Sequence, residues 1–340
     1  MKSLGGIARA TGVLAGLGLA GVTYAGVIER NWFALRHFHV PVLAPGTRPL
    51  RILQVTDLHF VPGQRRKLEW VQGLARLEPD LVVNTGDNLS HMEAVPPVLR
   101  ALDPLMDFPG VFVLGSNDVY APHLKNPARY LTRSYNENKD DRPLLPVDDL
   151  TKGMVTRGWL DLNNVRTMLE VAGVPLELVG VDDPHIQRDR YEWVSGPASE
   201  HAALTIGLTH APYQRVLDAM TADGATLVLA GHTHGGQLAL PYVGAIVTNS
   251  DLDRGRAKGL SRWWPGAGVH KVERDRPLGR DGVSHVSPWE TRASGQPQPE
   301  NAAWLHVSAG LGTSRFAPVR FACRPEASLL TLLPTDHARQ

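Results

Sequence analysis

Hydrophobic residues along the chain gather in short, nearly uninterrupted runs, and five of these runs stop abruptly at a glycine or at a histidine, aspartate or asparagine. The five runs cover residues 51–56, 81–85, 111–114, 204–209 and 227–230. Runs of this length with little polar alternation are typical of sheet strands buried on both faces, and helix-compatible segments separate several of them. The pattern therefore predicts an α/β fold.

Ionisable and polar residues stand where each run ends. They are Asp57 and His59, Asp87, the segment 115–118, His210, and the pair His232 and His234. Open α/β sheets bind ligands just beyond the carboxyl ends of their strands, so five such ends can converge on one point. A lone Asp or His there is usually a turn residue, a helix cap or a satisfied polar group. Five in the same context favour a shared metal site.

The other histidines lack this context and are left unassigned: His37, His39, His91, His123, His185, His201, His270, His285, His306 and His337.

The residue types predict two metal ions. Asp57 and His59 are two positions apart, as are His232 and His234, and side chains at that spacing leave the same face of an extended segment, so each pair can hold one ion. Carboxylates mixed with imidazoles suit Mn, Fe or Zn, whereas an all-oxygen set would favour Mg or Ca. Two carboxylates and four histidines exceed one tetrahedral site. Two ions that share a carboxylate can hold a bridging hydroxide and bind phosphoryl oxygens.

In order and spacing, these segments resemble the calcineurin-like metallophosphoesterases, specifically their membrane-associated, single-domain bacterial branch. The resemblance runs from about Arg51 to Leu333 and rests on D-x-H at 57–59, G-D at 86–87, the segment 115–118, a lone His210, and G-H-x-H at 231–234. It implies a two-sheet α/β/β/α sandwich whose second sheet includes residues 304–308 and 328–333. It also implies a dinuclear hydrolase in which a metal-bridging hydroxide attacks a phosphomonoester or phosphodiester.

The resemblance further implies which residues hold each ion. Asp57, His59, Asp87 and His234 would hold one ion, with Asp87 bridging, and His210 and His232 would hold the other.

The third motif departs from the family pattern, which is G-N-H-D or G-N-H-E. Here the segment reads Gly115-Ser116-Asn117-Asp118, so the family's Asn ligand aligns with Ser116, and its His, which protonates the leaving oxygen or stabilises the transition state, aligns with Asn117. Only Asp118, which orients that His, is kept. Either Asn117 supplies the ligand oxygen, which we favour, or Ser116 is the ligand and Asn117 donates a hydrogen bond. Loss of the general acid typically costs ~10²–10⁴ in rate.

The chain begins with an apolar segment. The run from Gly12 to Ile28 carries no charged residue and follows Lys2 and Arg9. As a helix rising ~1.5 Å per residue it would span about 25 Å, the short end of what crosses a bilayer. We expect residues 1–30 to form an uncleaved hydrophobic anchor helix, with a cleaved signal peptide as the alternative. Basic residues flank both sides, so the orientation is not indicated.

Proline and glycine content predicts the remaining boundaries. Residues 31–50 contain three prolines and a glycine near their end and are predicted to be a linker. The catalytic domain would cover residues 51–335. Residues from about 255 to 299, crowded with Gly, Pro, Arg and Trp, are predicted to be an irregular insertion.

Composition indicates which classes of binding partner the chain favours. Thirty-five basic and thirty-four acidic side chains give a net charge of +1, so no overall field favours nucleic acid. A single cysteine, Cys323, excludes an internal disulfide scaffold. No protein partner is indicated. The sequence thus predicts a membrane-associated phosphoesterase of the bacterial cell envelope, with a lipid-linked or envelope phosphate ester as substrate. The alternative is a membrane-tethered, metal-binding sensor or scaffold with weak or no catalysis, because the third motif is altered.

Overall fold

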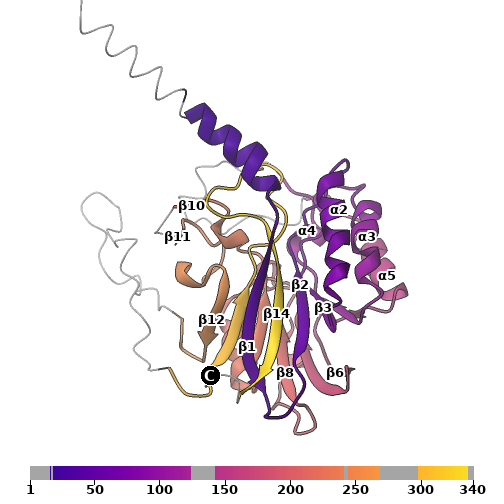
Figure 1. Cartoon of the computed structure of the whole chain (residues 1–340), viewed down its shortest axis with the longest axis vertical. Helices are drawn as coiled ribbons and strands as arrows, with labels where there is room; N and C mark the ends of the chain where they lie inside the picture. The colour runs from indigo at the N-terminus through magenta and orange to yellow at the C-terminus, as the bar shows by residue number, and fades with distance from the viewer. Residues whose placement is uncertain (1–15, 17, 124–141, 241–243, 269–297, 336–340) are drawn as a thin grey trace, which may run out of the picture.

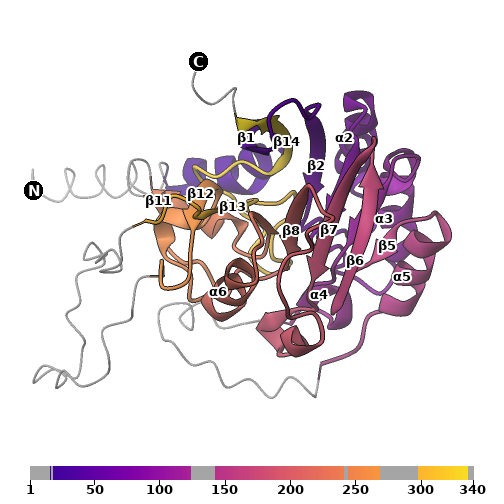
Figure 2. The ribbon, with the colours of Figure 1, turned by 90° about the horizontal axis from the view of Figure 1, so that it is seen from below.

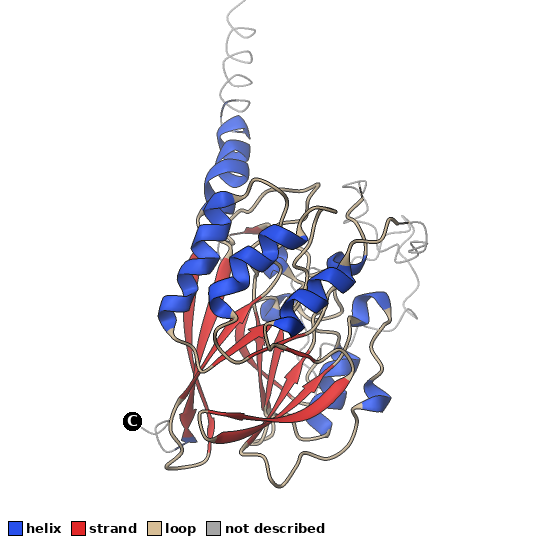
Figure 3. Cartoon of the chain, turned by 90° about the vertical axis from the view of Figure 1, so that its right-hand side faces the viewer, coloured by secondary structure: helices blue, strands red, loops and turns tan. Residues whose placement is uncertain are grey.

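Two six-stranded sheets pack face to face, and helices cover both outer faces (Figures 1 and 3). The structure is a computed structural model that describes residues 16, 18–123, 142–240, 244–268 and 298–335. The two-sheet α/β architecture predicted from the sequence is confirmed.

The first sheet has the strand order β1-β14-β2-β3-β4-β5. Its strands are β1 (Ala34–Leu43), β2 (Leu50–Val55), β3 (Leu81–Asn84), β4 (Gly110–Phe112), β5 (Leu160–Asp161) and β14 (Glu326–Pro334). Strands β2 to β5 are parallel to one another, whereas β14 is antiparallel to β2 and parallel to β1.

The second sheet has the order β12-β13-β9-β8-β7-β6. Its strands are β6 (Val165–Val171), β7 (Val174–Gly180), β8 (Leu204–Leu208), β9 (Leu227–Ala230), β12 (Gly259–Trp263) and β13 (Ala303–Val307). The four inner strands are parallel, and the edge strands β6 and β12 are antiparallel to their neighbours. Each of the five predicted strands is present, as β2, β3, β4, β8 and β9.

Both faces of each sheet are buried, which explains the uninterrupted apolar runs. Along β2, Ile52 packs in the core between the sheets and Leu53 packs beneath the helices, and neither is exposed. The first sheet is covered by α2 (Arg65–Gly73), α3 (Val95–Leu102) and α5 (Val147–Thr156), and the second by α6 (Gln214–Ala222). Shorter elements used below are α4 (Ser116–Val119), β10 (Ala239–Leu240), β11 (Gly244–Ala245), η1 (Tyr24–Ile28), η2 (Glu29–Asn31), η7 (Pro184–Ile186) and η9 (His234–Gly236).

Polar contacts cross the core between the sheets. The fully buried His306 of β13 lies with its Nδ1 2.6 Å from Oε1 of Gln54 on β2, and Gln54 in turn donates to the carbonyl of Ala230 (2.9 Å). The two sheets are therefore held in register by hydrogen bonds as well as by apolar packing.

The prediction that residues 31–50 form a linker is wrong. Residues 34–43 form β1, the edge strand of the first sheet, which pairs with β14 over its whole length. Val40 and Leu43 are fully buried between the sheets. The prolines suggested an irregular segment, but Pro41 lies within β1, and an edge strand tolerates the missing N–H of a proline. The folded body therefore begins before Arg51.

Two further expectations also need correction. The C-terminal runs 304–308 and 328–333 were expected in one sheet, but β13 lies in the second sheet and β14 in the first. The sequence does not show which sheet an apolar run joins, because that depends on its partners. The insertion predicted at 255–299 begins with regular structure, since β12 pairs with β13. Residues 269–297 of it lie outside the described part.

The N-terminal segment is helical where the structure describes it. Residues 18–23 form a helix that continues through η1 and η2 and projects from the body (Figure 1). Among the described residues, none of the helices has the length and apolar character that spanning a membrane requires. Residues 1–15 and 17, which include much of the predicted anchor, lie outside the described part.

Candidate metal centre

Four strand ends bring six predicted ligands together. Asp57 and His59 follow β2, Asp87 follows β3, His210 follows β8, and His232 and His234 follow β9. Because β2 and β3 belong to one sheet and β8 and β9 to the other, the ligands meet where the two sheets face each other. They form two groups, Asp57 with His59 and His234, and Asp87 with His210 and His232.

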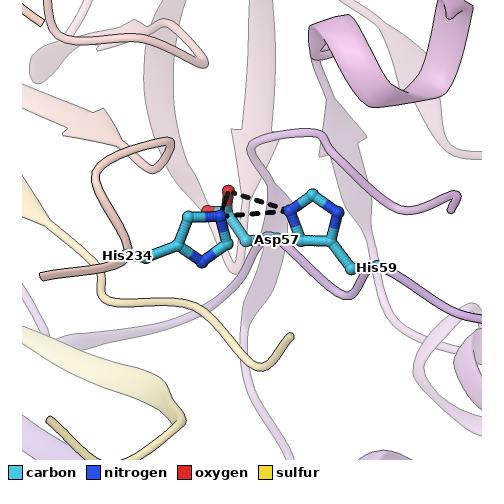
Figure 4. Close-up of side chains that lie close together, drawn as sticks. All are labelled: Asp57, His59 and His234. Carbon is cyan, nitrogen blue, oxygen red and sulfur yellow. Dashed lines mark hydrogen bonds and ion pairs between the residues drawn. The ribbon is translucent and has the colours of Figure 1, made fainter. Parts of the chain in front are cut away.

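The first group is a tight triad (Figure 4). Nε2 of His59 lies 3.2 Å from Nε2 of His234, and Oδ1 of Asp57 lies 3.9 Å and 3.6 Å from these two atoms. Oδ2 of Asp57 accepts hydrogen bonds from Thr56 Oγ1 (2.9 Å) and the His232 amide (3.0 Å). Those bonds leave Oδ1 as the oxygen that faces the histidines.

In the second group, the outer hydrogen bonds fix which ring nitrogen faces inward. His210 Nδ1 donates to the carbonyl of Thr85 (2.7 Å), so Nε2 faces Oδ2 of Asp87 at 3.4 Å. His232 Nε2 lies 3.2 Å from the carbonyl of Asn249, and its Nδ1 lies 3.2 Å from Nε2 of His210. Such outer contacts orient metal-binding histidines and set their tautomers.

Asp87 lies between the two groups. Its Oδ2 is 3.4 Å from His210 in the second group and 3.5 Å from Nε2 of His59 in the first. One carboxylate oxygen therefore contacts ligands of both groups, which is the position that a bridging ligand requires.

The backbone around the ligands differs from the extended one expected. Asp57, His59, Asp87, His232 and His234 all have positive φ, between 43° and 69°. Non-glycine residues rarely adopt this conformation, and clusters of them mark functional sites. The equal spacing of the two pairs was therefore misleading. Asp57 and His59 share one group, whereas His232 and His234 divide between the groups, which departs from the spacing argument and agrees with the division that the family resemblance implies.

Glycine is needed where the ligand loops touch. Gly86 has φ +90°, and a Cβ atom there would lie 2.5 Å from the amide nitrogen of Gly115. A Cβ atom on Gly115 would lie 2.3 Å from Oδ1 of Asp87. These glycines let the β3 and β4 loops approach each other closely and so place Asp87.

Burial controls the protonation of the first group. It raises the pKa of Asp57 to about 6 and lowers the pKa of His59 to about 4. Burial, followed by repulsion that a second proton on the neighbouring His59 and the charge of Arg320 would cause, lowers the pKa of His234 well below its usual range. The two histidines are therefore neutral, which is the form that binds a metal ion.

The second group contains a buried ion pair. Burial alone would raise the pKa of Asp87 and lower that of His210, but the attraction between them holds the pKa of Asp87 well below and that of His210 well above the usual range. A cation bound beside Asp87 would have to displace the proton on His210.

The donor set fits divalent transition metals. Oδ1 of Asp57 is buried and has no hydrogen-bond partner among the described residues, although it faces two neutral imidazoles. An unpaired buried carboxylate oxygen is costly unless a cation meets it. Together with the mixed imidazole and carboxylate ligands, this favours Mn, Fe or Zn over Mg or Ca.

The third motif lies against Asp87. Asn117 donates from its backbone amide to Oδ1 of Asp87 and from Nδ2 to Oδ2, both at 2.7 Å. Ser116 is buried at the start of α4, where its carbonyl accepts from the Tyr120 amide (2.9 Å). Among the described residues, the hydrogen bonds of the Asp118 carboxylate do not include one to the side chain of Asn117. Its carboxylate accepts from the backbone amides of Gly115, Asp87, Asn88 and Leu89.

Asp118 therefore clamps the β3 and β4 loops together instead of orienting its neighbour. Burial, followed by the charge of Asp87, raises its pKa to about 7.

Sequence reasoning missed Arg320. This fully buried guanidinium donates to the carbonyls of Ala309, Gly310 and Gly312 and lies 3.4 Å from Nδ1 of His234. Next to it, Glu29 of the N-terminal segment accepts from the amides of Ala322 and Cys323. Nothing in the local sequence around Arg320 signals this, since its partners are mostly backbone carbonyls.

His185 also lies near the candidate ligands, and the sequence contains a pattern that indicates this position. The buried run ending at Val181 stops at Asp182 and Asp183 at the carboxyl end of β7, which is the pattern that identified the other strand ends. His185, on η7, packs its ring 4.6 Å from that of His232, and its Nδ1 lies 3.0 Å from the hydroxyl of Tyr213. It therefore borders the second group of ligands.

Comparison with known proteins agrees with this geometry. A family model described as calcineurin-like phosphoesterase matches residues 50–236, more than half of the chain. An uncharacterized metallophosphoesterase of Bacillus subtilis (strain 168), YkuE, is 26% identical over 268 residues, which cover 76% of this chain and 70% of that protein. The phosphodiesterase YaeI of Escherichia coli (strain K12) is 26% identical over 238 residues, covering 66% of this chain and 75% of its own.

Among solved structures, TT1561 of Thermus thermophilus is 12% identical with a TM-score of 0.37 and covers 78% of this chain and 91% of that one.

Proposed function

The chain belongs to the calcineurin-like phosphoesterases, and we propose that it hydrolyses a phosphomonoester or phosphodiester at a dinuclear metal centre. The observation that carries the proposal is the position of Asp87, whose Oδ2 lies 3.5 Å from His59 and 3.4 Å from His210. Two groups of metal-ligating side chains that meet at one carboxylate suit two ions that share it. Diesters are the first substrate class to test, because one relative is named a phosphodiesterase.

In this proposal, Asp57, His59 and His234 would hold one ion, His210 and His232 would hold the other, and Asp87 would be shared by both. When bound, Mn, Fe or Zn ions would supply an activated water and hold the phosphoryl oxygens. The chain's own residues orient the ligands. Thr85 and Asn249 keep the inward-facing nitrogens of His210 and His232 available, and Asn117 holds both oxygens of Asp87 in place.

Turnover of bis(p-nitrophenyl) phosphate with added Mn tests the proposal, with Asp87→Asn as the control. We expect the unsubstituted protein to bind two equivalents of metal and to hydrolyse the diester. Asp87→Asn should lose metal and activity together while its circular dichroism stays unchanged, since Asp87 coordinates and does not fill the core. Two bound equivalents in Asp87→Asn would contradict the bridging role. A rate no higher than that of the control would favour the alternative, a metal-binding sensor or scaffold.

We also propose that residues 12–28 anchor the protein in the membrane of a bacterial cell envelope and that the substrate is a lipid-linked or envelope phosphate ester. The absence of charge over these residues supports the anchor. The full-length protein should stay with membranes through high-salt and carbonate washes, because neither removes apolar contacts. A mature chain that begins near Gly26 would instead identify a cleaved signal peptide.

A further inference from the structure

Large apolar side chains are exposed on the loops beside the metal centre. We call this set the apolar rim, and its members, each between 36% and 46% exposed, are Leu238, Leu240, Ile246, Phe316 and Phe321. They come from the β10–β11 hairpin that follows His234 and from the loop that precedes β14.

Backbone contacts join these loops into one surface. The amide of Ala239 donates to the carbonyl of Phe321 (2.9 Å), and the amide of Ile246 donates to the carbonyl of Leu238 (3.4 Å). Gln237 donates from its side chain to the carbonyl of Ala317, next to Phe316. The loops that carry the rim are therefore held together, and exposed apolar side chains gathered on adjoining loops are typical of an interaction site.

The rim borders the first group of ligands. The amide of Gln237 donates to the carbonyl of His234 (2.9 Å). On the other side, Arg315 donates to the carbonyl of Ser90 (2.7 Å), and the hydroxyl of Ser90 lies 3.0 Å from Nδ1 of His59. The side chain of His234 is 14% exposed, whereas those of His59 and Asp57 are 3% and 0% exposed. The group is thus most accessible at His234, the ligand nearest to the rim.

The N-terminal helical segment extends the same apolar surface. The ring of Tyr24 meets that of Phe321 edge-on, with the ring centres 6.3 Å apart. The segment lies beside the β10–β11 hairpin in two perpendicular views (Figures 1 and 2). Its outward side chains include Leu19, 70% exposed, and Val22, 65% exposed. Exposed apolar side chains of this size gain stability when they leave water, so this surface favours an apolar environment.

Cationic side chains lie among these apolar ones. Arg315 stacks near Phe316 (6.0 Å to the ring centre), and Arg324 stacks on the half-exposed Trp32 (4.2 Å). Arg30 donates to the carbonyl of Pro318 on the rim loop. Arginines beside exposed aromatic rings suit the headgroup layer of an anionic membrane, where the negative surface potential attracts basic side chains.

We propose that the apolar rim lies against the bilayer surface, so that the metal centre opens onto the lipid headgroups. This inference rests on the proposed function and narrows the substrate class. The substrate would be a phosphoester at the membrane surface whose apolar part stays in the bilayer while its phosphate reaches the two groups of ligands.

Site-specific labelling of the full-length protein tests this placement. Phe316→Cys on the rim and Met168→Cys on β6, at the opposite edge of the second sheet from β12, carry the environment-sensitive fluorophore NBD. The two positions are equally exposed, 45% and 44%. Cys323 is buried, so the unsubstituted chain serves as the labelling blank. Both proteins are reconstituted into vesicles of phosphatidylcholine and phosphatidylglycerol, with and without doxyl-labelled lipid.

We expect the label at 316 to show blue-shifted emission in vesicles and quenching by doxyl lipid, while the label at 168 shows neither. Identical behaviour of the two labels would overturn the proposal. A blue shift at 316 without quenching by doxyl lipid would also overturn it, because a protein contact and not lipid would then cover the rim. Turnover of bis(p-nitrophenyl) phosphate by the labelled proteins is measured separately. Quenching does not need catalysis, so a failure of the proposed hydrolysis is distinguishable from a failure of the membrane placement.

Discussion

At the scale of single residues, the third motif is where the chain departs from its family's pattern. Asn117 replaces the expected histidine and holds Asp87, while Asp118 binds four backbone amides. Asn117 can donate or accept a hydrogen bond at neutral pH but cannot supply a proton. Its role therefore differs from that of a general acid.

Substitutions at 116 and 117 separate the two interpretations of this motif. If the amide oxygen of Asn117 is a ligand, Asn117→Ala lowers metal occupancy and Ser116→Ala changes it little, which is the outcome we expect. Metal analysis of the two purified variants measures this. Full occupancy in Asn117→Ala would contradict the ligand role and leave the phosphoesterase function standing.

If Asn117 occupies the missing histidine's place instead, Asn117→His should restore a proton donor. Alkyl esters, whose leaving group needs a proton, should then gain up to ~10² in rate, while p-nitrophenyl esters should gain little. The measurement compares the hydrolysis rates of alkyl and p-nitrophenyl esters by Asn117→His and by the unsubstituted protein.

His306 gives a prediction of pH-dependent stability away from the metal ligands. It is fully buried between the sheets, and burial lowers its pKa to about 3 from an ordinary value of 6.5. Below pH 6.5 the unfolded chain therefore binds a proton that the folded chain does not bind. The stability is fully present above pH 6.5 and falls as the pH drops toward 3, by up to about 1.4 kcal/mol per pH unit.

Urea unfolding of the unsubstituted protein and of His306→Gln, measured over this pH range, checks the prediction. The free energies of unfolding of the two proteins should converge as the pH falls, because the substituted glutamine side chain does not titrate. Two parallel pH profiles would contradict it.

At the scale of elements, β1 and the segment before it belong to the catalytic body. β1 covers β14, and Glu29 caps the backbone at 322–323 next to Arg320, which lies beside His234. The N-terminal region is thus connected to the metal centre through one short chain of contacts.

Truncation tests the role of β1. A chain that begins at Leu50, expected from the sequence to hold the whole domain, loses the buried Val40 and Leu43 and leaves β14 as an unpaired edge. Loss of those two side chains alone costs roughly 3–6 kcal/mol. We expect this chain to aggregate or to unfold at a clearly lower temperature. A chain that begins at Tyr24 retains these contacts and serves as the matched control, compared by calorimetry. Equal melting temperatures would contradict the prediction.

At the scale of the whole molecule, the two sheets together assemble a site with six buried or nearly buried ligands. Asp57, Asp87 and four histidines lie together there, and Oδ1 of Asp57 has no hydrogen-bond partner among the described residues. Metal binding and global stability should therefore be linked.

Metal removal measures that linkage. Mn at a hundred times its dissociation constant should stabilise the fold by about 2.7 kcal/mol for each ion, and a chelator should remove that increment. Asp87→Asn should show much less dependence on Mn. Calorimetry with Mn and with chelator measures the melting temperature under both conditions. If the melting temperature of the unsubstituted protein is the same in both, metal binding and stability are not linked.

The sequence by itself determined the strands that carry the site and the six ligand positions at their ends. Both are local features, since a strand buried on both faces needs a continuous apolar run and a ligand at its end follows directly in the chain. Asp57, Asp87, His210 and His232 could therefore be identified without coordinates.

Only the tertiary structure decided what supports these residues and which conformation the backbone takes around them. The family resemblance already divides His232 from His234, and the structure adds that both residues have a left-handed backbone, which residue spacing does not show. The partners of β1 and Glu29 lie far along the chain, and Glu29 accepts from the amide of Cys323, 294 positions away. The role of Arg320 likewise depends on contacts made in the folded chain. Such contacts have no local signature, because a backbone carbonyl or amide that accepts or donates them is present in every residue.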